Sequence, residues 1–301
     1  HFAKSNILHQ QNDYKKSMRE LIKANKIKLT IYPSKANSLI EKSKQLLIKT
    51  KTYKSINTKD INYPEYLFIV GMPRSGSTLL ESILGMNKDI HDLGEVNILE
   101  HAYLEWQDLI KNKNSKSLIK LYSNQVSNLV SQFKTTTNKW LYNYNYTGII
   151  SSQIPTAKII HCYRNPLDNI LSIFRTHFAE GNRYSSSLID CTKVYLEHDH
   201  VMTEYKKIFP NKIYDFNYDS LVTNPKEEIK SLIEWLNWNW NNSYLSPHLN
   251  NRTVSTASDV QVRFPINSKS LGGWKNYKEL LRPVIEYIAN YDKYSYLIDQ
   301  F

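Results

Sequence analysis

The chain has 301 residues, of which 41% are hydrophobic and 12% aromatic, so it can bury the core of an α/β domain with an appendage and is not a disordered chain. Its formal net charge of +11 suits anionic partners such as nucleotides, acidic glycans or acidic peptides, although a lysine-rich solvated surface gives the same composition. Two cysteines exclude a disulfide framework, and no segment approaches the roughly 18–20 apolar residues of a membrane span.

The first 50 residues differ from the rest of the chain. Their apolar residues have helical spacing, and a polar turn at 11–13 interrupts it, which predicts two antiparallel helices. A helix pair cannot bury both of its faces alone, so a repeat array or docking onto the next domain must supply the partner surface. Residues 51–63 are polar and lysine-rich, and we interpret them as a linker.

Residues 64–301 alternate between strand and helix patterns. Apolar runs within 64–85, 157–168 and 212–222 predict strands, the first of which continues through a loop into a helix. Helices are predicted within 91–106, 117–133, 139–155, 169–179, 193–210 and 225–238. This alternation predicts an α/β fold in which helices flank a central parallel sheet, with ligands bound beyond the carboxyl ends of the strands.

The segment "YLFIVGMPRSGSTLLESILG" (66–85) predicts a strand, a glycine-rich loop and a helix, which is how backbone amides hold a phosphate at a helix N-terminus. It keeps the glycine spacing of the nucleotide loop G-x-x-x-x-G-K-[ST], but Ser77 replaces the lysine and Arg74 is the cation of the loop. The missing lysine argues against an ATPase or kinase, and a purely structural turn is the other alternative. The residues expected to bind the anion are Arg74, Ser75, Gly76, Ser77 and Thr78.

A second polar segment, "IIHCYRNPLDNILS" (159–172), follows a predicted strand. Arg164 lies just past the strand, and Ser172 lies about two turns into the next helix. Both can converge on one terminal phosphate, whereas the alternative for Arg164 is a salt bridge with Asp168.

Together, these segments resemble the family of sulfotransferases that depend on 3′-phosphoadenosine-5′-phosphosulfate. In that family a "PRSGST" loop, here residues 73–78, holds the 5′-phosphosulfate, and an "R-x-P-x-D-x-x-x-S" segment, here 164–172, holds the 3′-phosphate. The resemblance implies a P-loop-like sheet, transfer of a sulfuryl group to an acceptor hydroxyl, and adenosine 3′,5′-bisphosphate as the product. It implies no metal, and the histidines and cysteines show no metal-ligand spacing.

The resemblance also implies catalytic residues. The "GE" at 94–95 matches the catalytic glutamate of tyrosylprotein sulfotransferases and their bacterial relatives, which makes Glu95 the general base, although Glu95 could merely cap the following helix. "NKWLYNYNY" (138–146) resembles the family pattern DK-x-P-x-N, with Asn138 and Leu141 as departures. Lys139 would then offset charge on the sulfuryl group together with Arg74, unless it is an ordinary surface lysine.

Two later segments extend the resemblance to nearly the whole chain. "YDSLVTNP" (218–225) resembles the segment that lines the adenosine 3′-phosphate site, and makes Tyr218 a contact or else a core aromatic residue. Residues 253–283 resemble the C-terminal lid over the cofactor. Its expected ligand contacts are Ser258, Arg263 and Ser270.

The N-terminal helices resemble the last unit of a tetratricopeptide array, which a subgroup of these sulfotransferases carries before the catalytic domain. We therefore predict a helical pair (1–50), a linker (51–63) and a sulfotransferase domain (64–301), with a protein partner for the helices and an acidic peptide or glycan as acceptor. A P-loop kinase or nucleotidase and a non-catalytic repeat-bearing scaffold are the alternatives. No nucleic-acid recognition motif is found. No signal peptide is visible either, and we expect a cytoplasmic protein, although the chain begins at His1 rather than Met.

Overall fold

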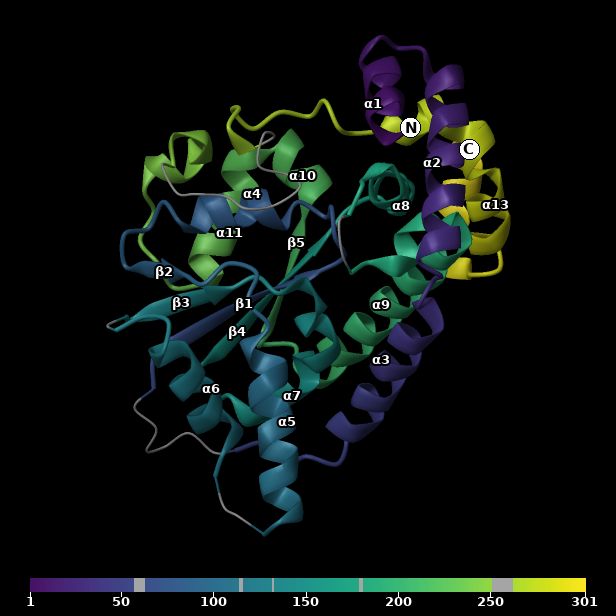
Figure 1. The fold of residues 1–301 in the computed structure, drawn as a ribbon. Helices are drawn as coiled ribbons and strands as arrows, with labels where there is room; N and C mark the ends of the chain where they lie inside the picture. The colour runs from purple at the N-terminus through teal and green to yellow at the C-terminus, as the bar shows by residue number, and fades with distance from the viewer. Residues whose placement is uncertain (57–62, 114–115, 132, 179–180, 251–261) are drawn as a thin grey trace. The chain divides into compact units, whose positions relative to one another are not determined.

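The computed structural model describes residues 1–301 except 57–62, 114–115, 132, 179–180 and 251–261 (Figure 1). The chain divides into two compact units. The sheet unit comprises Ser43–Tyr163 and His200–Ile266, and the helical unit comprises His1–Lys42, Arg164–Asp199 and Asn267–Phe301.

The sheet unit is built on five strands, and each of the four neighbouring pairs is parallel (Figure 1). In order across the sheet they are β2 (Ile90–Asp92), β3 (Thr135–Asn138), β1 (Glu65–Gly71), β4 (Ala157–Tyr163) and β5 (Ile213–Asn217). Parallel neighbours align their carboxyl ends on one edge, so the segments that follow these strands gather there. The predicted parallel sheet is confirmed.

The central strand β1 is buried on both faces, as its continuous apolar run predicts. Successive side chains of a strand point to opposite faces. Tyr66, Phe68 and Val70 accordingly enter one hydrophobic cluster, whereas Leu67 and Ile69 enter the other.

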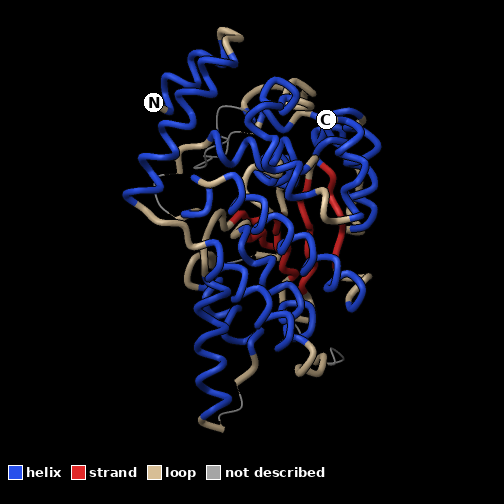
Figure 2. The backbone as a smooth tube through the Cα atoms, turned by 90° about the vertical axis from the view of Figure 1, so that its right-hand side faces the viewer, coloured by secondary structure: helices blue, strands red, loops and turns tan. Residues whose placement is uncertain are grey.

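Helices cover both faces of this sheet, and Figure 2 shows the strands in red with helices on either side. The cluster around Tyr66 and Phe68 is completed by α5 (Ile98–Lys111), α6 (Leu118–Ser127) and α7 (Thr147–Gln153). The cluster around Leu67 and Ile69 is completed by α4 (Ser77–Leu84), α10 (Tyr218–Thr223) and α11 (Pro225–Trp235). The short η1 (Leu141–Tyr146) leads into α7, and η3 (Asn242–Leu245) and η4 (Pro247–Leu249) follow α11.

The helical unit joins segments from the two ends of the chain to the segment after β4. The Tyr277 hydroxyl is hydrogen-bonded to the side chains of His9 at 2.9 Å and Ser17 at 3.0 Å, and Asn25 Nδ2 donates to the Phe174 carbonyl at 3.0 Å. Its elements are α1 (Phe2–Gln10), α2 (Tyr14–Ile31), α8 (Pro166–Arg175), η2 (Arg183–Ser186), η5 (Gly273–Tyr277), α13 (Lys278–Ile288), η6 (Asp292–Tyr294) and α14 (Ser295–Gln300). Helices α3 (Ala36–Thr50) and α9 (Leu188–Ile208) belong partly to each unit.

The N-terminal region differs from the two predicted helices. The polar turn at 11–13 does separate α1 from α2, and the Asp13 side chain caps α2 by accepting from the Lys16 amide at 3.1 Å. A third helix, α3, follows because Pro33 ends α2 and a new helix begins at Ala36. The likeness to a tetratricopeptide unit and the division at residues 50 and 63 stay predictions.

Two other differences concern the sheet unit. Strands β2 and β3 were not predicted, because β2 has three residues and β3 has the sequence Thr-Thr-Thr-Asn, which carries no apolar pattern. The sequence of residues 212–222 predicts a strand that runs into a turn, whereas in the structure helix α10 follows β5. Asn217 caps this helix through its side-chain oxygen, which accepts from the amides of Asp219 at 2.8 Å and Ser220 at 3.3 Å.

Candidate active site

The glycine loop, residues 71–78, leaves the end of β1 and enters α4 in the sheet unit. Three of its residues have positive φ angles, Gly71 with 150°, Arg74 with 67° and Gly76 with 97°. Such turns aim successive N–H groups into a concavity that suits an anion. A Cβ atom at Gly76 would lie 2.3 Å from Cδ2 of Tyr218, so glycine is required here both for conformation and for space.

The polar side chains of the loop fit a phosphate or sulfate group. The Oγ atom of Ser75 is buried and has no hydrogen-bond partner among the described residues. Ser77 and Thr78 are also buried, at the positive end of α4. An unsatisfied buried hydroxyl is costly in a folded protein, so an anion that accepts from Ser75 would remove that cost.

Lys139 lies immediately after β3, and its side chain is 1% exposed. Its Nζ atom is 2.7 Å from Glu95 Oε1 and 3.4 Å from Glu81 Oε2. The backbone N–H of Lys139 donates to the Gly94 carbonyl at 3.0 Å, which ties the end of β3 to the segment that carries Glu95. The structure thus brings Glu95 and Lys139 together, and the burial of Lys139 contradicts the alternative of an ordinary surface lysine. The catalytic roles of both residues stay predictions.

Lys139, Glu81 and Glu95 form a charged cluster in which the side chains shift the pKa values of Lys139 and Glu81. Burial alone would lower the pKa of Lys139, but the carboxyl groups of Glu81 and Glu95 raise it above its ordinary value, so the side chain is an ammonium group. Burial raises the pKa of Glu81 to about 8; Lys139 opposes this rise and Asp92 adds to it. Glu95 is 44% exposed, so among these carboxyl groups it is open to a solvent-borne molecule.

Asn138 occupies the position of the acid in the family pattern. Its Nδ2 donates to the Val96 carbonyl at 3.1 Å, and its Oδ1 accepts from the Trp140 amide at 3.1 Å and from Asn143 Nδ2 at 3.0 Å. The residue is buried, so these bonds fix the segment on either side of Lys139. Asn138 therefore has a structural role beside Lys139.

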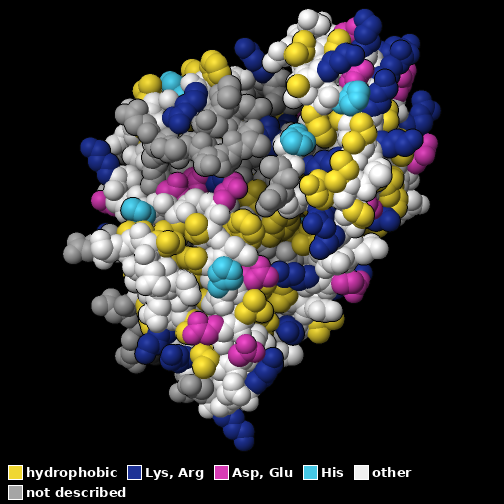
Figure 3. Space-filling view, viewed as in Figure 1, with side chains coloured by type: hydrophobic (Ala, Val, Ile, Leu, Met, Phe, Trp, Pro, Cys, Tyr) yellow, Lys and Arg dark blue, Asp and Glu magenta, His cyan; other side chains and the backbone are white. Residues whose placement is uncertain are grey.

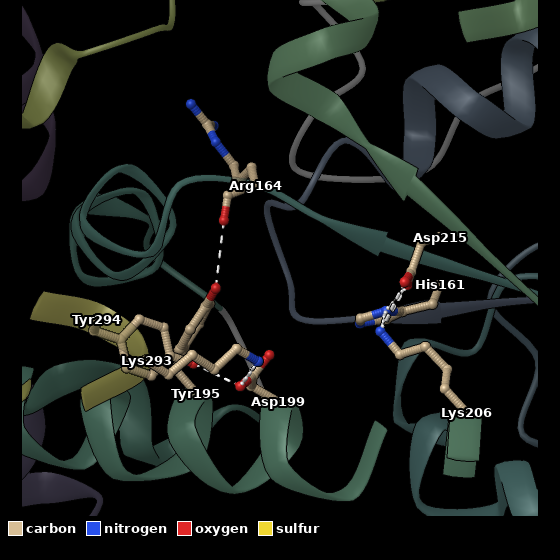
Figure 4. A network of polar contacts seen from close by, with 8 residues as sticks. All are labelled: His161, Arg164, Tyr195, Asp199, Lys206, Asp215, Lys293 and Tyr294. Atoms are coloured by element: carbon tan, nitrogen blue, oxygen red, sulfur yellow. Dashed lines mark hydrogen bonds and ion pairs between the residues drawn. The ribbon is translucent and has the colours of Figure 1, made fainter. Parts of the chain in front are cut away.

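A second set of predicted residues lies in the helical unit. Arg164 Nη2 donates to the Ser270 carbonyl at 2.9 Å, and another hydrogen bond joins Tyr195 Oη to the Arg164 carbonyl at 3.3 Å (Figure 4). Arg164 also lies 3.7 Å from Asp168, which is the salt bridge foreseen as the alternative to phosphate binding. Asp168 accepts from the amides of Gly272 at 2.8 Å and Trp274 at 2.9 Å, so one carboxylate ties α8 to the C-terminal segment.

The remaining predicted residues have separate surroundings. Tyr218 is half-buried at the start of α10 and contacts the glycine loop at Gly76. Ser172 is half-buried on α8, and the exposed Arg263 donates from Nη1 to the Asn250 carbonyl at 3.1 Å. Ser258 lies outside the described residues. The binding roles of these residues stay predictions.

Two polar groups of the sheet unit were missed. Glu81 lies in the helix predicted after the glycine loop and was not singled out, because its burial and its contact with Lys139 arise only in the fold. His161 Nδ1 lies 2.8 Å from Asp215 Oδ1, which also accepts from Lys206 Nζ at 2.8 Å (Figure 4). No sequence signal pairs these residues, because β4, β5 and α9 meet only in the fold.

The charges are spread rather than concentrated. Figure 3 shows Lys and Arg side chains over the visible face with acidic side chains between them. Among the described residues, no group of His, Cys, Asp and Glu could hold a metal ion. Nor does that part of the chain contain a helix long and apolar enough to cross a membrane.

A model of the sulfotransferase family matches residues 64–242, which is more than half of the chain. The chain therefore belongs to the sulfotransferase family, and the resemblance seen in the sequence is confirmed. The matched residues contain the glycine loop, Glu95, Lys139 and Arg164.

Similar proteins agree with this assignment. An uncharacterized protein of Aquifex aeolicus is 30% identical over 307 residues, which cover 95% of this chain but only 40% of that protein's length. A Caenorhabditis briggsae protein provisionally named a protein-tyrosine sulfotransferase is 23% identical over 234 residues, covering 71% of this chain and 81% of that protein. The solved sulfotransferase domain from the Synechococcus PCC 7002 olefin synthase has the same fold, with a TM-score of 0.53 and 17% identity over 74% of this chain and 91% of that domain.

Proposed function

We propose that this chain transfers a sulfuryl group from 3′-phosphoadenosine-5′-phosphosulfate to an acceptor hydroxyl. One observation carries the proposal: the buried ammonium of Lys139 contacts Glu95 at 2.7 Å and Glu81 at 3.4 Å. Glu81 lies four residues after Ser77 on α4, roughly 6 Å along the helix from the glycine loop. A cation, an exposed carboxylate and an anion cradle are therefore close together, and family membership supports their use in sulfuryl transfer.

The donor would be held mainly by two groups of residues. The amides and hydroxyls from Ser75 to Thr78, with the Arg74 guanidinium, suit the 5′-phosphosulfate. The resemblance assigns the 3′-phosphate to Arg164 and Ser172, and further contacts to Tyr218, Ser258, Arg263 and Ser270. The buried Ser75 hydroxyl supports an anion at the loop, since it would otherwise lack a partner.

In the proposed reaction Glu95 accepts the proton of the acceptor hydroxyl while the acceptor oxygen forms a bond to sulfur. The bond between sulfur and the 5′-phosphate oxygen breaks, and that oxygen keeps the electron pair as adenosine 3′,5′-bisphosphate leaves. Lys139 and Arg74 offset negative charge on the sulfuryl group and the leaving phosphate. The acceleration comes from positioning and electrostatics, and the reaction needs no metal.

The acceptor is proposed to be an acidic peptide with a tyrosine, or a glycan. The net charge of +11 and the Lys and Arg side chains in Figure 3 suit an acidic molecule. The Caenorhabditis briggsae relative, by its name, supports a tyrosyl acceptor.

A cytoplasmic location and a protein partner for the N-terminal helices are part of the proposal. Cys162 and Cys191 are both free and buried, which suits a reducing compartment. On α1 and α2, the side chains of Ile7, Ile22 and Ile27 are exposed, which suits contact with another protein surface.

Calorimetric titration tests the donor site. We expect adenosine 3′,5′-bisphosphate to bind in the presence of a chelator, and 5′-AMP to bind much more weakly because it lacks the 3′-phosphate. ATP–Mg²⁺ is the third ligand, since a P-loop kinase or nucleotidase would bind it instead. Binding of ATP–Mg²⁺ alone would replace the proposal by a kinase, and binding of none of the three would favour a non-catalytic scaffold.

A further inference from the structure

Glu81 is a buried carboxyl group beside the glycine loop that the proposed reaction does not use. The residue is 8% exposed and lies on α4, where it is the charged residue among the buried positions. Its Oε2 atom lies 3.4 Å from Lys139 Nζ, and its buried Oε1 atom finds no hydrogen-bond donor in the described part of the chain. A carboxyl group in this position is costly unless its partners compensate for the lost water.

The groups that face this carboxyl come from several segments. Asp92 ends β2, Lys139 follows β3, and Cys162 lies on β4 within electrostatic reach, while Glu95 contacts Lys139. One ammonium therefore contacts two carboxyl groups, Glu81 and Glu95, and Asp92 is a third carboxyl group that interacts with the buried Glu81. Such a cluster favours an additional bound proton, and the buried member holds it most readily.

Asp92 can accept a hydrogen bond from the protonated carboxyl group of Glu81. Its Oδ1 already accepts from the Gly94 amide at 2.7 Å and from Thr137 Oγ1 at 3.2 Å, which fixes the carboxylate in place. A protonated Glu81 can then donate from Oε1 to Asp92 while its Oε2 accepts from Lys139. This arrangement satisfies every polar atom of Glu81.

We propose that Glu81 is a positioning residue of this site, whose carboxyl group holds the Lys139 ammonium beside the glycine loop. This inference rests on the proposed function. Glu95 is 44% exposed, so its side chain can change position. A lysine that contacted Glu95 alone would move with it. Once Glu95 has taken the acceptor proton, it attracts Lys139 less, and Glu81 then keeps Nζ where the sulfuryl charge develops.

The role has a defined pH dependence. The pKa of Glu81 is raised to about 8, so the group is neutral at lower pH and ionises as the pH rises through that value. An ionised Glu81 draws Lys139 into a full ion pair and adds negative charge next to an anion site. Turnover and affinity for adenosine 3′,5′-bisphosphate should therefore fall above about pH 8.

Two substitutions separate this role from packing. Glu81→Gln keeps the shape, donates to Asp92 and accepts from Lys139, so it imitates the protonated form at every pH. Glu81→Leu keeps the volume and removes both bonds. Glu234→Gln is the matched control, because Glu234 is 67% exposed and lies 3.8 Å from Lys230 as a surface pair.

The first measurement is the acetylation rate of each lysine by acetic anhydride, followed by mass spectrometry of peptides. Glu81→Leu should acetylate at Lys139 about tenfold faster than the wild type, as expected for loss of a hydrogen bond to a charged group. Glu81→Gln and the control should match the wild type. An unchanged Lys139 rate in Glu81→Leu would overturn the proposal, and this readout does not depend on sulfuryl transfer.

The second measurement is the pH profile of turnover with 3′-phosphoadenosine-5′-phosphosulfate and an acidic tyrosine peptide. The wild type should lose turnover above about pH 8, whereas Glu81→Gln should keep it and stay within about twofold of the wild type at pH 7. The same high-pH loss in Glu81→Gln would overturn the inference even if Glu81→Leu does not fold. An inactive wild type would instead refute the proposed function, and lysine acetylation would still decide the positioning role.

Discussion

The glycine loop predicts a strong effect for Gly76→Ala. Gly76 has φ 97°, a left-handed conformation that costs an alanine about 1–2 kcal/mol. The new Cβ would also lie 2.3 Å from Tyr218 Cδ2 and 3.1 Å from Tyr218 Cβ, whereas carbon atoms in contact are about 3.5–4 Å apart. Tyr218 begins α10, which Asn217 caps, so its ring can yield only by leaving its rotamer at a further cost of about 1 kcal/mol.

The two costs together amount to about 2–3 kcal/mol at the loop. If the loop must keep its conformation to hold the anion, this energy opposes binding, and the affinity for adenosine 3′,5′-bisphosphate should fall by roughly thirtyfold to 150-fold. Calorimetric titration measures this affinity. Gly181→Ala is the matched control, because Gly181 has φ 67° but, apart from its chain neighbours, no described residue lies within 4 Å of the added Cβ. That control should lose about 1 kcal/mol of stability and no affinity.

A double-mutant cycle separates the steric cost from the backbone cost. Tyr218→Ala removes the ring, so Gly76→Ala should be less harmful in that background by about 1 kcal/mol. If Gly76→Ala binds the bisphosphate like the wild type, residues 71–78 do not form the anion cradle. Equal effects of Gly76→Ala and Gly181→Ala would likewise refute the steric argument.

Three further predictions concern single side chains. Glu95→Gln should keep the affinity for adenosine 3′,5′-bisphosphate but lose about a hundredfold or more of turnover, and unchanged turnover would exclude Glu95 as the base. Asp168→Ala should lower the free energy of unfolding in urea by about 2–5 kcal/mol, because the amides of Gly272 and Trp274 lose their acceptor; a loss under about 1 kcal/mol would contradict this. Burial alone would raise the pKa of Asp215, but His161 and Lys206 lower it to about 2. The carboxylate therefore stabilises the fold above its unfolded pKa near 3.8, and this stabilisation is lost as the pH falls toward 2. Since Asp215 is 40% exposed, Asp215→Asn should cost roughly 1 kcal/mol at pH 7 and much less near pH 2, and a constant difference across that range would contradict the ion pairing.

The fold could be predicted where a single stretch of sequence carries the whole signal. The apolar run of β1 is continuous because both faces of the strand are buried, and the glycines of the loop follow it directly. Strand β3 could not be predicted in this way. Its threonines are buried in the sheet. Four polar residues carry no apolar pattern that would predict this burial.

The site was predictable to the extent that its residues lie in recognisable segments. Glu95 and Lys139 are 44 residues apart, and only the resemblance linked them before the fold placed them 2.7 Å apart. Glu81 could not be assigned, because its burial and its contact with Lys139 arise from the pairing of β1 with β3. Arg164 lies 3.7 Å from Asp168, as in the structural alternative stated for it, and its binding of the 3′-phosphate stays a prediction.

The most direct test of the account is transfer of a radiolabelled sulfate group from 3′-phosphoadenosine-5′-phosphosulfate, in the presence of a chelator, to an acidic peptide that contains tyrosine. A glycan serves as the second acceptor, and Glu95→Gln as the variant. The account predicts labelled acceptor and stoichiometric adenosine 3′,5′-bisphosphate with the wild type, and little of either with the variant. Binding of the bisphosphate without any transfer to either acceptor, or equal transfer by Glu95→Gln, would contradict it.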